Sequence, residues 1–104
     1  MTDVVVIFCA CGTHDEALDI GRSLIEARLA ACANVLPQAH SIYRWQGKVE
    51  TAQEVLLLIK TTQERFPAVR DRITQLHSYD TPEIIGMPVT EGSDKYLAWL
   101  RDQV

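Results

Sequence analysis

Two segments that are apolar at nearly every position constrain the fold more than any other feature of this sequence. Val4–Cys11 contains only apolar side chains, and residues 55–59 read Val-Leu-Leu-Leu-Ile. Successive side chains of a strand point to opposite faces of its sheet. In the second strand Leu57 therefore lies on one face and Leu58 on the other. A sheet built on two such strands must be covered on both sides.

The surrounding segments predict two helices, a long hairpin and a short terminal helix. Thr13 and Glu16 form a T-x-x-E capping box, so we expect a helix that runs to about Arg28. Pro37 donates no ladder hydrogen bond and should interrupt the second strand. The other expected elements are a strand over 31–36 that resumes over 41–45, a tight turn at 46–47, a return strand over 48–50, a core strand over 54–61, a helix over 65–76, a polar loop over 77–83, a strand over 84–90 and a helix over 94–102.

This order predicts one α+β domain over residues 1–104. The βαββαβ pattern is typical of the ferredoxin-like fold, an antiparallel sheet with two helices on one face. The two helices leave the second face of the sheet uncovered, and it would expose more apolar surface than monomers usually tolerate. A second subunit is the simplest cover, with the long hairpin as the arm that reaches it. Tyr43 and Trp45 share one face of this arm and are interpreted as interface aromatics.

The charge and the cysteine content of the chain limit the classes of binding partner and the cellular compartment that we expect. Fourteen acidic residues outnumber ten basic ones, which gives a net charge of −4. This balance argues against nucleic acid or an anionic membrane surface as a partner. No apolar run approaches the roughly 20 residues of a membrane-spanning helix. The odd number of cysteines, three, and the absence of a secretory leader predict a cytoplasmic protein with free thiols.

Four segments of the sequence are distinctive in combination. They are the run over 27–37, the arm over 41–50, the His-x-Tyr-x-Thr-Pro-Glu loop over 77–83 and the segment over 88–99 that contains Tyr-x-x-Trp. Together they resemble the CutA family, the divalent-cation tolerance proteins. The resemblance extends from Val4 to about Leu100. It implies a ferredoxin-like homotrimer that binds copper or other divalent cations. The family name refers to a tolerance phenotype rather than to a reaction.

The resemblance also implies a metal site at Cys9, Glu54 and His77. A thiolate and an imidazole suit Cu²⁺ or Zn²⁺, and a carboxylate supplies a harder third ligand. The alternative interpretation is that Cys9 is a small buried hydrophobic residue, as many free cysteines are. Cys11, which the family match does not require, lies on the same face of the strand about 7 Å further along. The two thiols either share a soft ion such as Cu(I) or are unrelated core cysteines.

A second candidate site is a ligand cleft, for which the resemblance implies a position between subunits. Its residues are Lys60, Tyr79, Glu83, Tyr96 and Trp99. A cation, two phenols, a carboxylate and an indole can hold a small anionic or aromatic ligand. In the alternative interpretation Tyr96 and Trp99 attach the terminal helix, while Lys60 and Glu83 form an ion pair.

These features favour a homotrimeric, copper-binding protein involved in tolerance of metal ions. The alternative is a trimeric small-molecule sensor that resembles PII-like signalling proteins. An enzyme is not expected, because the sequence lacks a phosphate-binding glycine loop, a Cys-x-x-Cys motif and a nucleophile–base pair at diagnostic spacing.

Overall fold

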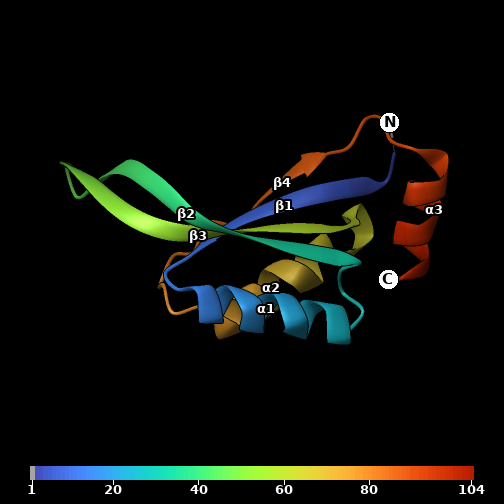
Figure 1. Cartoon of the computed structure of the whole chain (residues 1–104), viewed down its shortest axis with the longest axis horizontal. Coiled ribbons are helices and arrows are strands. Elements are labelled where there is room, and N and C mark those ends of the chain that lie inside the picture. Colours follow the sequence, from blue (N-terminus) through green and yellow to red (C-terminus); the bar gives the residue numbers. More distant parts are fainter. Residues whose placement is uncertain (1) are drawn as a thin grey trace.

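The computed structural model describes residues 2–104, which form a four-stranded sheet and three α-helices (Figure 1). In chain order the elements are β1 (Val4–Cys11), α1 (His14–Glu26), β2 (Cys32–Trp45), β3 (Lys48–Thr62), a 3₁₀ turn (Gln63–Arg65), α2 (Phe66–Leu76), β4 (Ile85–Pro88) and α3 (Asp94–Asp102). The strand order is β2-β3-β1-β4 with antiparallel pairing throughout. The ferredoxin-like α+β fold expected from the sequence is confirmed.

The main core lies between the sheet and the helices α1 and α2. Leu57 and Ile59 of β3 point to this side and are fully buried, together with Ile7 of β1. Gly21 allows α1 to approach the sheet closely, because a Cβ atom at this position would lie 3.3 Å from the Cβ of Ala33. We call this side of the sheet the helix face.

The opposite side, which we call the open face, carries the other apolar half of the same strands. Leu56 and Leu58 of β3 and Phe8 of β1 lie here and are only partly buried. Their neighbours on the outer strands are more exposed, Ile85 at 55% and Leu36 at 41%. The chain therefore leaves most of this apolar face uncovered.

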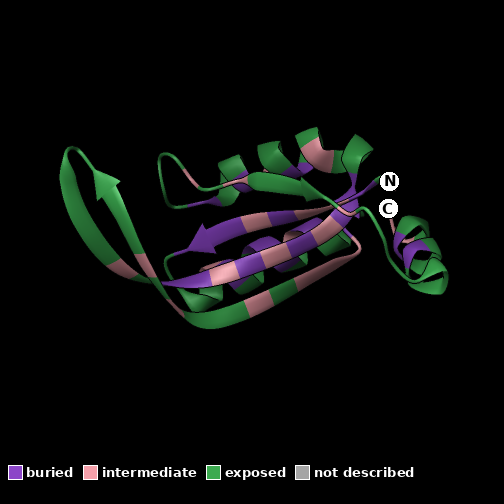
Figure 2. Cartoon of the chain, turned by 90° about the horizontal axis from the view of Figure 1, so that it is seen from above, coloured by how far each residue is buried: buried purple, intermediate pink, exposed green. Residues whose placement is uncertain are grey.

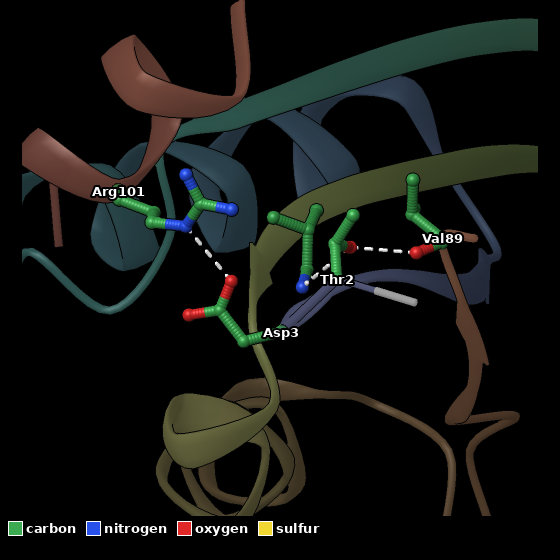
Figure 3. A network of polar contacts seen from close by, with 5 residues as sticks. Thr2, Asp3, Val89 and Arg101 are labelled. Carbon is green, nitrogen blue, oxygen red and sulfur yellow. Dashed lines mark hydrogen bonds and ion pairs between the residues drawn. The ribbon is translucent and has the colours of Figure 1, made fainter. Parts of the chain in front are cut away.

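Helix α3 covers one end of the open face. Leu97 and Leu100 pack against Val4 at the start of β1. An ion pair of 2.8 Å between Arg101 and Asp3 ties the helix to the same end (Figure 3). The Arg101 guanidinium also holds the pKa of Asp3 below its ordinary value.

The β2–β3 hairpin extends beyond the helices as an arm whose surface is almost entirely exposed (Figures 1 and 2). A register shift between Leu36 and Ala39 marks the irregularity expected at Pro37, but β2 continues through it as one strand. Gln46 and Gly47 both have positive φ angles, 50° and 80°, as a two-residue hairpin turn requires. The expected hairpin is confirmed.

The ends of two elements differ from the sequence expectation. Helix α1 ends at Glu26 rather than near Arg28, because Arg28 adopts a left-handed conformation with φ 57°. The amides of Arg28 and Leu29 then bond back to the carbonyls of Ile25 and Leu24, which is the Schellman pattern that closes a helix. Strand β4 covers Ile85–Pro88 rather than 84–90.

Candidate metal centre and neighbouring groove

Three potential metal ligands meet beneath the sheet, on the helix face. The sulfur atoms of Cys9 and Cys11 and a ring nitrogen of His77 all lie within 4.8 Å of one another. The two-residue period of β1 directs both thiols to the same side. His77 reaches them because it is the C-cap residue of α2. Two of the three predicted metal ligands, Cys9 and His77, are thus brought together, and Cys11 joins them.

The cluster is almost completely shielded from solvent. Cys9 and Cys11 are 0% exposed and His77 is 8% exposed. The neighbouring Cys11 sulfur, followed by burial, raises the pKa of the Cys9 thiol. The Cys9 thiol lowers the pKa of Cys11, against the opposing effect of burial.

His77 uses both ring nitrogens in hydrogen bonds. Its Nε2 lies 2.8 Å from the carbonyl oxygen of Ala10, and its Nδ1 accepts a 3.0 Å bond from the amide of Tyr79. An amide can only donate, so Nδ1 carries the lone pair and Nε2 carries the proton. The imidazole is held in one orientation beside the two cysteines.

Glu16 of α1 holds the loop that follows His77. One carboxylate oxygen accepts a 2.7 Å hydrogen bond from the amide of Ser78, and the other accepts from the amide of Gly12. Burial raises the pKa of Glu16, but the bonds from Ser78 and Gly12 outweigh that effect, so the pKa is lowered. The Glu16 carboxylate, predicted to accept from a first-turn amide of α1, bonds to the amides of Gly12 and Ser78 instead and so fixes the metal-ligand loop.

Glu54 lies apart from the cluster. Its position in β3 alternates with Val55, so it belongs to the open face, where its carboxylate accepts a 2.9 Å hydrogen bond from the Tyr79 hydroxyl. Burial, followed by this hydrogen bond, raises the pKa of Tyr79 to about 12. Tyr79 therefore connects the two sides of the sheet: its backbone amide bonds to His77 and its hydroxyl bonds to Glu54.

An open groove of about 670 Å³ begins at Glu54 and Tyr79 and extends along the arm as far as Trp45. Glu83 lines it as well, together with the two arm aromatics Tyr43 and Trp45. The groove contains two of the predicted ligand-cleft residues, Tyr79 and Glu83.

The other three predicted cleft residues gather near α3. Tyr96 and Trp99 lie with ring centroids 5.5 Å apart, and the ammonium nitrogen of Lys60 lies 5.8 Å from the Tyr96 ring centroid. Within residues 2–104 the ion pairs are Arg70–Asp71 and Arg101–Asp3, so an ion pair between Lys60 and Glu83 does not form. In one chain the predicted cleft is therefore divided into two groups.

The donor set of the cluster fits a metal ion of soft or borderline character. Two sulfurs and an imidazole nitrogen are ligands that copper and zinc accept. The sequence signal for Cys11 was its two-residue spacing from Cys9, which places both thiols on one face. The contact of both with His77 depends on how α2 packs beneath β1. For Cys9 it was signalled only by the family resemblance, and for Cys11 it had no signal in the sequence.

Comparison with known proteins assigns nearly the whole chain to one family. A family model described as "CutA1 divalent ion tolerance protein" matches residues 5–103. The divalent-cation tolerance protein CutA of Thermus thermophilus is 47% identical over 98% of this chain and 97% of its own length. Human protein CutA is 43% identical over 94% of this chain, which spans only 55% of that protein.

Solved structures agree with the arrangement of the elements. The crystal structure of CutA from Xylella fastidiosa superposes with a TM-score of 0.95 at 45% identity and covers 98% of both chains. The solved structure of the Thermus thermophilus divalent cation tolerance protein superposes with a TM-score of 0.94 at 45% identity and covers 96% of this chain and 97% of its own. The chain belongs to the CutA1 divalent ion tolerance protein family.

Proposed function

We propose that the protein is a homotrimer that binds Cu²⁺, and Zn²⁺ more weakly, and that it acts in tolerance of metal ions. The observation that carries this proposal is the buried meeting of Cys9 and His77 in a member of a family named for divalent ions. Cu²⁺ stands above Zn²⁺ in the general affinity series of divalent ions. The printed name of the family refers to tolerance, not to catalysis.

In this proposal Cys9 and His77 are the principal ligands. Glu54 is the third predicted ligand, and to reach the ion it must exchange its hydrogen bond with Tyr79 for the metal. Thiolates bind metal and thiols do not, so binding releases protons and the affinity should fall as the pH falls. Burial keeps water from competing for the ion.

The open face supports the trimeric part of the proposal. A monomer would leave the partly buried Leu56 and Leu58, and the more exposed Ile85, in contact with water. Apolar patches of this kind mark subunit interfaces. The exposed arm, with Tyr43 and Trp45 on the same side as the open face, supplies aromatic anchors. A mass of one chain in light scattering at micromolar concentration would contradict a trimer.

The cytoplasmic location of the protein remains a prediction. Cys9, Cys11 and Cys32 are free thiols, which supports the reducing cytoplasm. Within residues 2–104 no helix has both the length and the apolar character needed to cross a membrane. A relative from Arabidopsis thaliana is named chloroplastic and a structure from Archaeoglobus fulgidus is titled periplasmic, so compartment varies among the relatives.

Calorimetry with Cu²⁺ on the wild type, His77→Ala and Cys9→Ser tests the proposal. Each variant is first shown to keep the oligomeric size of the wild type, and Cys32→Ser serves as a matched control because Cys32 lies outside the cluster. We expect both cluster variants to bind Cu²⁺ more weakly. If both bind it as tightly as the wild type, the metal site is elsewhere. A small-molecule site in the groove beside Tyr79 and Glu83 then becomes the leading proposal.

A further inference from the structure

We propose that Cys11 completes a three-coordinate site with Cys9 and His77, and that this site selects Cu(I) over divalent ions. The inference rests on the proposed function, because both use Cys9 and His77, but it adds a third ligand and ranks Cu(I) above the Cu²⁺ and Zn²⁺ of that proposal.

The spacing of the ligand atoms matches a trigonal site. An ion at the centre of an equilateral triangle with 4.8 Å sides lies about 2.8 Å from each corner, since 4.8 divided by √3 is 2.8. This value is an upper bound, because 4.8 Å is the limit within which the atoms lie. Metal–sulfur bonds of about 2.3 Å require ligand atoms about 4 Å apart in a trigonal plane. Shifts of about half an ångström therefore suffice to form the site.

The number and type of donors favour Cu(I). Soft thiolate ligands select Cu(I), whereas Cu²⁺ prefers tetragonal sites with nitrogen and oxygen ligands. Zinc sites are tetrahedral and need a fourth protein ligand or a water molecule. The cluster within residues 2–104 has three members, and all three are buried. Three soft or borderline donors without a fourth satisfy Cu(I) better than Zn²⁺ or Cu²⁺.

Two of the carboxylates close to the cluster, Glu16 and Glu54, are committed to other contacts. Glu16 accepts hydrogen bonds from the amides of Ser78 and Gly12. Glu54 accepts from the Tyr79 hydroxyl on the open face. Neither of these two carboxylates can become a fourth ligand without breaking its hydrogen bonds.

Binding through His77 must break one identified hydrogen bond. The neutral ring has one lone pair, which Nδ1 shares with the amide of Tyr79. A metal at Nδ1 displaces this amide directly. A metal at Nε2 forces the proton onto Nδ1, which removes the acceptor. In both cases the Tyr79 amide loses its partner, so its hydrogen exchange should accelerate when the site is filled.

Anaerobic competition with the Cu(I) chelator bicinchoninate, run beside Zn²⁺ titrations, tests the inference. The proteins are the wild type, Cys9→Ser, Cys11→Ser, Cys11→Ala, His77→Asn and the control Cys32→Ser. Each is first checked for native circular dichroism and oligomeric size, and the two Cys11 variants guard against an effect of a buried hydroxyl. We expect both Cys11 variants to lose about 100-fold in Cu(I) affinity while Zn²⁺ affinity changes by less than about threefold. X-ray absorption of the Cu(I) form should show two sulfur neighbours.

The outcomes separate this inference from the proposed function. Wild-type Cu(I) affinity in the Cys11 variants, an equal loss of Cu(I) and Zn²⁺ affinity in them, or a single copper–sulfur contact would overturn the inference. Divalent-ion affinity that is unchanged in Cys9→Ser and His77→Asn would overturn the proposed function alone. An unaltered exchange rate of the Tyr79 amide on loading with Cu(I) would remove His77 from the ligand set and overturn the three-coordinate site.

Discussion

The helix face and the open face of one sheet have nearly the same apolar character but very different surroundings. Leu57 and Leu58 are adjacent in β3, yet Leu57 is fully buried beneath α1 and α2 and Leu58 is only partly buried. The same contrast separates Ile7 from Phe8 in β1. The alternation of side chains along each strand places these residues on opposite faces of the sheet. The helices α1 and α2 cover only one of those faces.

The contrast indicates that the two faces of the sheet have different roles. The helix face holds the monomer together and contains the buried metal-ligand cluster. The open face contains the groove and shares its side with the arm aromatics. We expect substitutions on the helix face to prevent folding and substitutions on the open face to prevent assembly.

The largest effect is expected for Leu57→Asp. An unpaired carboxylate in the core costs about 4 kcal/mol or more, which is comparable with the whole stability of a small domain. We expect insoluble or unfolded protein, measured by circular dichroism of the purified chain. Leu57→Met, which nearly conserves volume, is the control and should fold. A folded Leu57→Asp protein would show that the helix face is not the core of the monomer.

Leu58→Asp should prevent assembly of the subunits rather than folding of the chain. Leu58 lies on the open face, so its charge can reach water in the single chain and the fold should persist. The same charge in a subunit interface would be buried without a partner. We expect native-like circular dichroism and the mass of one chain in light scattering, whereas Leu58→Met keeps the assembled mass. Assembly of Leu58→Asp at the wild-type mass would mean that this face stays exposed to solvent.

A smaller effect is expected in the arm. Trp45 is 56% exposed in the single chain, so its contacts there stabilise little. If it anchors the arm on another subunit, Trp45→Ala should weaken assembly by about 2 kcal/mol. The matched control is Val49→Ala on the other side of the arm, where Val49 is 65% exposed and pairs with Arg44. Thermal melts over a range of protein concentrations measure both. Equal behaviour of the two variants would exclude Trp45 as an anchor.

The smallest effect is expected for Glu16, which holds the loop that follows His77. Its pKa is lowered in the folded protein, so the ionised form stabilises folding above its ordinary pKa of 4.5. This stabilisation is lost as the pH falls through the lowered value. We expect Glu16→Gln to be less stable than the wild type near neutral pH, with the difference shrinking below pH 4.5 in urea titrations. A constant difference across this range would assign the effect to packing.

Most of the fold could be predicted because its signals are local. The N-cap hydrogen bond at Thr13 and the Gln46-Gly47 turn each act within a few residues, and both form as expected. The Glu16 half of the capping box does not form as expected, because its carboxylate accepts from the amides of Gly12 and Ser78. The end of α1 was predicted less well. Arg28 adopts a left-handed conformation usually taken by glycine, and nothing in its own side chain signals that.

The candidate site was predicted in part because its members come from separate elements. The resemblance implied Cys9, Glu54 and His77, and the two-residue period placed Cys11 beside Cys9. The structure joins both thiols to His77 and leaves Glu54 with Tyr79. Whether Glu54 moves to the metal stays a prediction.

The sequence by itself determined the alternation of apolar residues, the order of the elements and the need to cover two faces of one sheet. Only the tertiary structure decided which face α1 and α2 occupy, that α2 ends beneath β1 so that His77 meets both thiols, and that Tyr79 bridges the two sides. The physical reason is distance along the chain. Periodicity and capping act between near neighbours, whereas the contact between Cys9 and His77 depends on how whole elements pack.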